Sequence, residues 1–73
     1  MPLIDIQLVE GAFDADQKAD IVKGVTDTMV TVGGEPIRGV TWVRVVETPD
    51  GNWSIGGRTL TAADMQSLTK GAA

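Results

Sequence analysis

The order of three segments most constrains how this chain folds. Residues 2 to 9 read as a strand, and Pro2 is tolerated at its first position because no ladder donor is needed there. Residues 39 to 47 are rich in Val and predict a second strand. Between them, apolar residues repeat at the three-to-four spacing of one helix face: Ile21, Val22, Val25, Met29 and Val32. Strand, helix and strand in this order predict a right-handed parallel β-α-β unit, an α/β fold.

Signals at both ends delimit the expected helix. Asp14 and Gln17 have the three-residue spacing of a capping box, which marks a helix start. Gly33 and Gly34 mark its end, and Pro36 follows just beyond them. Asp14, Asp16 and Asp20 are expected to be start-of-helix charges and not a cation site.

The last third of the chain predicts shorter elements. Residues 48 to 51 form a turn by composition, and residues 52 to 55 form a short extended piece. Thr61 and Asp64 match a second capping box, so a short helix is expected over residues 62 to 69. The fold expected is two parallel strands, one main helix and a short C-terminal hairpin or helix.

Size and composition favour association with other copies. The 73 residues are expected to form one domain, 1–73, and a chain of this length buries only about 60% of its unfolded surface. The chain has no Cys and no His, so we expect no disulfide and no metal. Alternation places Trp42, Arg44 and Val46 on the sheet face that the helix does not cover, and such a face favours another subunit.

Charge and hydropathy exclude other partners. Ten acidic and six basic residues give a net charge of −4, which argues against nucleic acid. No apolar run approaches the ~20 residues that span a bilayer. The first residues lack the basic region and cleavage site of a signal peptide, so we expect a cytoplasmic protein without a membrane partner.

Pro2 is the main candidate for chemistry. A small residue after the initiator normally allows Met1 to be removed, and Pro2 would then be the N-terminus. Its secondary amine can act as a base, an acid or a nucleophile. A chain without His and Cys has few other groups suited to chemistry near neutral pH.

Several motifs together resemble the tautomerase superfamily, and most of all its short 4-oxalocrotonate tautomerase group. Pro2 is followed by an Ile/Leu strand, then by Glu10-Gly11 and by a helix start over Asp14–Lys18. An aromatic-x-Ile-Gly-Gly element follows as Trp53-Ser54-Ile55-Gly56-Gly57. The resemblance spans the chain from Pro2 to about Leu60.

This resemblance implies a fold, an assembly and an activity. The subunit would be a β-α-β unit that joins sheets in dimers, and usually assembles as a hexamer. Pro2, freed of Met1, would be the general base of a cofactor-free isomerase. It would move a proton within a small unsaturated 2-oxo or 2-hydroxy acid, and Trp53 would line the pocket.

The family's usual arginines are absent at their expected positions. Ala12 stands where many members carry an Arg after the Glu-Gly turn. With one inserted residue, Trp42 stands where they carry a second Arg. Arg44, on the same face as Trp42, and Arg38, at the strand entry, are the candidates to bind the substrate carboxylate. We favour Arg44, and a single anchor favours monoacids over diacids.

Each arginine also has a structural interpretation. Arg44 could pair with Glu47 or Asp5, whereas Arg38 and Arg58 fit solvated surface charges. Two functional alternatives stay open. A protonated Pro2 would be a general acid that hydrates, dehalogenates or decarboxylates a small unsaturated acid. A non-catalytic subunit would keep the fold and provide interfaces only.

Overall fold

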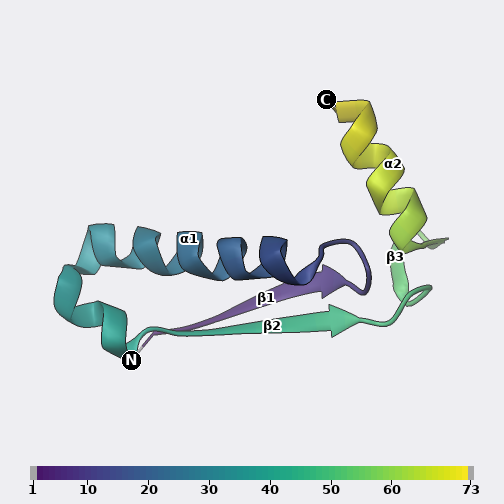
Figure 1. The fold of residues 1–73 in the computed structure, drawn as a ribbon. Helices are drawn as coiled ribbons and strands as arrows, with labels where there is room; N and C mark the ends of the chain where they lie inside the picture. The colour runs from purple at the N-terminus through teal and green to yellow at the C-terminus, as the bar shows by residue number, and fades with distance from the viewer. Residues whose placement is uncertain (1, 73) are drawn as a thin grey trace. The chain divides into compact units, whose positions relative to one another are not determined.

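The structure is a computed structural model that describes residues 2–72 (Figure 1). Its elements, in chain order, are β1 (Leu3–Val9), α1 (Ala15–Gly33), the 3₁₀ helix η1 (Glu35–Val40), β2 (Trp42–Thr48), β3 (Trp53–Ile55), β4 (Arg58–Leu60) and α2 (Ala62–Ala72). The chain forms two compact units. The first holds the residues up to Ile6 with Asp14–Val46, and the second holds Gln7–Phe13 with the residues from Glu47 onward.

Strands β1 and β2 pair in parallel, as the order of elements predicted. At one end the Trp42 amide donates to the Pro2 carbonyl over 2.9 Å. At the other end the Glu10 amide donates to the Thr48 carbonyl over 2.8 Å. Both bonds fit one parallel register, in which each β1 residue lies beside the β2 residue 39 positions later.

Helix α1 lies along one face of this sheet (Figure 1). Side chains from both strands and the helix are half-buried between them: Ile4, Ile6, Val43, Val45, Ile21, Val22, Val25 and Met29. Within the first unit, however, no residue that the structure describes is fully buried. One helix on two strands is too thin a layer to close a core.

The opposite face of the sheet is open. The register places Leu3 beside Trp42 there, and these side chains are 57% and 58% exposed. Asp5 and Arg44 lie next along the same face. The expectation that Trp42 and Arg44 share the uncovered face is confirmed, and Val46 on that face is half-buried.

The ends of α1 agree with its capping signals. The Gln17 amide donates to Asp14 Oδ1 over 2.8 Å, and the Asp14 amide donates to Gln17 Oε1 over 2.9 Å, so the capping box is present. After the helix, Gly34 adopts a φ of 90°, which strongly favours glycine.

Two expectations about this region are wrong. The strand expected over residues 39 to 47 begins only at Trp42, because η1 occupies Glu35–Val40. Pro36 sits in the first turn of η1, where its fixed φ suits a helix and its missing N–H costs nothing. Val32 does not continue the inner stripe of α1 and is 84% exposed. At that end α1 packs on η1, so Ile37 takes the inner position.

The second unit contains a hairpin and a helix. Strands β3 and β4 pair antiparallel, with Trp53 opposite Leu60 and Ile55 opposite Arg58. The two glycines between them have φ values of 58° and 84°, the positive pair that a tight type I′ turn requires. Val9 and Leu60 are the buried apolar residues of this unit, at 3% and 4% exposure. The expected C-terminal hairpin and helix are both present.

Helix α2 also begins with a capping box. The Thr61 amide donates to Asp64 Oδ2 over 2.9 Å, and the Asp64 amide donates to Thr61 Oγ1 over 3.2 Å. The helix runs to Ala72, three residues beyond its expected end. Across residues 2–72, no helix combines the length and apolar character needed to cross a bilayer.

Removing the first capping box should destabilise the fold. Asp14→Ala is expected to lower the free energy of unfolding by about 1 kcal/mol, because the Gln17 amide loses its acceptor. The matched control is Asp20→Ala, an exposed acid of the same helix outside the cap, which should change it by less than about 0.5 kcal/mol. Urea unfolding at fixed subunit concentration measures both. Equal losses in the two variants would contradict the capping role.

Candidate functional site

Pro2 lies immediately before β1 and is half-buried. Its carbonyl accepts the Trp42 amide, so the sheet register holds the backbone of Pro2 against the first residue of β2. The strand thus fixes the residue whose nitrogen is the proposed reacting atom. The expected removal of Met1 concerns a residue outside the described range.

Arg44 binds Asp5 across the open face of the sheet. Its Nε donates to Asp5 Oδ1 over 2.9 Å and its Nη2 donates to Oδ2 over 3.0 Å, a two-pronged contact. The hydrogen bonds from Arg44 lower the pKa of Asp5, and the same contact raises the pKa of Arg44. Arg44 therefore already has a carboxylate partner within the chain.

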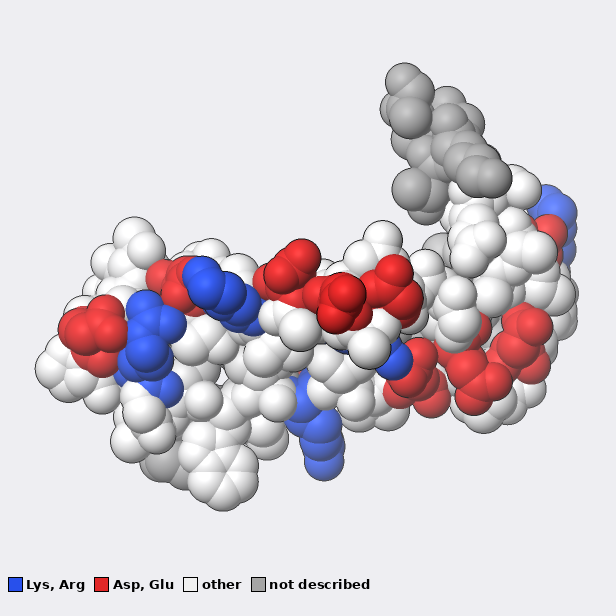
Figure 2. Space-filling model, viewed as in Figure 1, with Lys and Arg blue, Asp and Glu red and all other residues white. Residues whose placement is uncertain are grey.

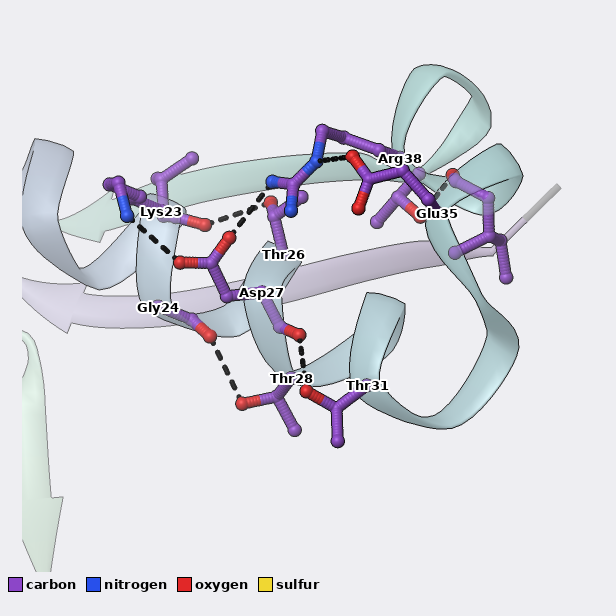
Figure 3. Close-up of polar contacts among 11 residues, drawn as sticks. Lys23, Gly24, Thr26, Asp27, Thr28, Thr31, Glu35 and Arg38 are labelled. Atoms are coloured by element: carbon purple, nitrogen blue, oxygen red, sulfur yellow. Dashed lines mark hydrogen bonds and ion pairs between the residues drawn. The ribbon is translucent and has the colours of Figure 1, made fainter.

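Arg38 is engaged more extensively, at the junction of α1 and η1 (Figure 3). Its Nε donates to Glu35 Oε1 over 2.7 Å and its Nη1 donates to Asp27 Oδ1 over 2.8 Å. Both contacts raise the pKa of Arg38, that with Glu35 most. Asp27 also accepts Lys23 Nζ over 2.9 Å, and its pKa is lowered chiefly by Arg38 and then by Lys23. Arg38 thus ties the 3₁₀ turn to the helix.

Trp53 belongs to the second unit, where it is half-buried at the start of β3. In an antiparallel pair, opposite residues share a face and successive residues alternate. The register of β3 and β4 therefore puts Trp53, Ile55, Arg58 and Leu60 on one face of the hairpin. Ala12, also in this unit, brings only a methyl group to the position after the Glu10-Gly11 turn.

Arg58 is the first residue of β4 and is exposed, as expected of a solvated surface charge. Of the three arginines, it alone has a guanidinium without a hydrogen bond or ion pair to residues 2–72. A sequence signal for its placement exists. A two-glycine turn fixes the hairpin register, so the residue after the turn lies opposite Ile55 and on the face of Trp53.

The site residues are thus distributed over the two units. Pro2, Arg38 and Arg44 lie in the first, and Trp53 lies in the second. Acidic side chains gather along α1 (Figure 2), but among residues 2–72 no three His, Cys, Asp or Glu side chains cluster as a metal would require. The chemical groups on hand are a half-buried proline, arginines and an aromatic face.

Comparison with known proteins starts at that proline. The model of the tautomerase enzyme family matches residues 2–63. A probable tautomerase, K2, of Dickeya dadantii is 35% identical over 68 residues, which cover 92% of this chain and 98% of that protein.

Solved structures agree with this match. TomN, a 4-oxalocrotonate tautomerase homologue of the tomaymycin biosynthetic pathway, is 30% identical, with a TM-score of 0.72 over 90% of this chain and 95% of its own. DmpI from Helicobacter pylori is 31% identical, with a TM-score of 0.69 over 81% and 95%. The resemblance inferred from the motifs is confirmed: the chain belongs to the tautomerase family of enzymes.

Proposed function

We propose that this protein is a cofactor-free tautomerase whose general base is the amine of Pro2 after removal of Met1. The nitrogen accepts a proton from one position of a small unsaturated 2-oxo or 2-hydroxy acid. The resulting prolinium returns that proton to another position, so the isomerisation is redox-neutral and proton-balanced. The observation that carries the proposal is Pro2 itself, held by Trp42 immediately before β1 and first in the family match.

The environment of Pro2 suits a base. A base must be neutral at working pH, and burial against apolar groups disfavours the charged form of an amine. Pro2 is half-buried, and its backbone is fixed beside Trp42. We therefore place the pKa of its amine below that of an exposed prolyl amine.

The substrate carboxylate needs a cation. Arg44 and Arg38 are the predicted cations for this role. Each already binds a carboxylate of the chain, which it would have to share or release in order to bind the substrate. Trp53 stays the predicted apolar wall. With Ala12 after the Glu10-Gly11 turn, a monoacid is the proposed substrate class.

We further propose a homo-oligomer, most simply a hexamer, with sites at subunit boundaries. The first unit has no fully buried residue among those described, and Leu3 and Trp42 lie side by side in solvent. Exposed apolar patches of this kind are typical of interfaces.

Changing Pro2 tests the base directly. Pro2→Ala keeps an amine but makes it primary and more flexible, so turnover of phenylenolpyruvate to its keto form should fall by about 10²-fold or more. The folded structure should survive, as circular dichroism would show. Intact mass must first establish that Met1 is absent, because an acylated proline nitrogen has no basicity. Wild-type turnover in Pro2→Ala would refute the assignment.

The pH profile gives a second test. The chain has no His and no Cys, the side chains whose ordinary pKa values lie nearest to the range from about pH 5 to 8. A rise of kcat/KM with pH in that range would thus report loss of the proton from the Pro2 amine. This limb should shift in Pro2→Ala. A profile flat from pH 5 to 8, or a fall with rising pH, would favour Pro2 acting in another protonation state.

Assembly is testable by light scattering. The wild-type protein should be a hexamer at micromolar concentration, and Trp42→Asp should dissociate it by placing a charge on the open sheet face. The matched control is Val32→Asp, which puts the same charge on a valine that is already 84% exposed on α1 and should leave assembly intact. A folded wild-type monomer would contradict the proposal.

A further inference from the structure

Arg58 differs from the other arginines in having an unoccupied guanidinium. Arg44 makes two hydrogen bonds to Asp5, and Arg38 binds two carboxylates. Within the described part of the chain, the guanidinium of Arg58 makes no hydrogen bond or ion pair. An incoming carboxylate must displace or share an acid at Arg44 or Arg38, whereas at Arg58 it displaces only water.

The hairpin gives Arg58 a defined place beside apolar surface. Ile55 lies directly opposite it, and Trp53 lies two residues before Ile55 on the same face. Trp53 is half-buried and Ile55 is 61% exposed, so the face offers an aromatic ring and an aliphatic side chain next to the cation. The two-residue turn fixes this register, because both of its glycines adopt positive φ.

The acids of the second unit that lie near the start of α2 do not occupy Arg58. Asp64 accepts the Thr61 amide over 2.9 Å, and Asp50 accepts the Ala62 amide over 2.8 Å. Arg58 acts on Asp64 only through its charge, as one of the smaller causes of the lowered pKa of Asp64. The guanidinium therefore keeps its donors for a ligand, on a chain whose net charge of −4 otherwise repels anions.

We propose that Arg58 is a specificity-determining residue that binds the substrate carboxylate, while Trp53 and Ile55 contact an apolar tail of the same substrate. This inference rests on the proposed tautomerase function and names its substrate class: monoacids with an aryl or alkyl group, and not diacids. It assigns the carboxylate to the hairpin and leaves Arg44 with Asp5 and Arg38 with its two acids.

Kinetics with charged and neutral substrates test the assignment. Arg58→Gln should raise KM for phenylenolpyruvate about tenfold or more, the value of one charge-assisted hydrogen bond, with a smaller change in kcat. The methyl ester of the same substrate lacks the anion, so its kcat/KM should be nearly unchanged. Arg58→Lys should restore part of the loss for the acid. Lys23→Gln removes an exposed cation of α1 and is the matched charge control.

The rival arginines provide the outcome that would overturn the inference. An acid-specific rise in KM in Arg44→Gln or Arg38→Gln, with Arg58→Gln at the wild-type value, would move the anchor to that residue. A similar loss for acid and ester in Arg58→Gln would show a structural role of Arg58 and would also overturn it.

Binding separates this inference from the proposed function. Nitrogen-15 spectra resolve the guanidinium Nε–H of arginines, and titration with cinnamate, an unreactive aryl monoacid, should shift that of Arg58 and the Trp53 indole N–H. The measurement needs no turnover, so it stands even if Pro2→Ala shows that Pro2 is not the base. Shifts confined to Arg44 or Arg38, or none at all, would refute Arg58 as the anchor while leaving the Pro2 test untouched.

Discussion

The parallel pairing of β1 with β2 is the interaction on which the rest of this structure depends. Its register is set at one end by the Pro2 carbonyl and at the other by the Glu10 amide. One residue of slip would turn every side chain of a strand to the opposite face. In the observed register, Asp5 meets Arg44 on the open face. The register that fixes the backbone of Pro2 therefore also pairs Arg44, the cation of that face, with Asp5.

The first unit is built from only two strands, one α-helix and one 3₁₀ helix, so its apolar layer is thin. Two strands and one helix leave the first unit without a fully buried residue among those described, although Ile4, Ile6 and Val45 all turn towards α1. Local devices offset part of this deficit. Capping boxes begin both helices, and Arg38 joins η1 to Asp27 on α1. Of these contacts, the exposed ion pair between Arg38 and Asp27 fixes local geometry more than it adds stability. In the proposed oligomer, burial of the open face would add a larger hydrophobic contribution.

Features governed by neighbours in sequence could be predicted from the sequence. The β-α-β order, the Asp14 and Thr61 capping boxes and the hairpin turn all depend on spacing within a few residues. Features that depend on how elements meet were harder to predict. Val32 has the spacing of the inner stripe, but η1 supplies Ile37 at that end of the helix. Asp5 and Glu47 were both possible partners of Arg44, and the register between the strands decides for Asp5.

The three arginines differ in whether an acid of the same chain already binds the guanidinium, and this decides which of them can bind a ligand without losing a partner. The resemblance to the tautomerase family made Arg44 and Arg38 the predicted cations. Each is nonetheless bound to acids of the same chain, and a ligand there gains only the difference between two similar contacts. Arg58 stands after a turn whose geometry is locally determined, and the described acids near it are committed to the backbone of α2. In the proposed assignment the hairpin would supply the guanidinium that Ala12 cannot, on the same face as Trp53.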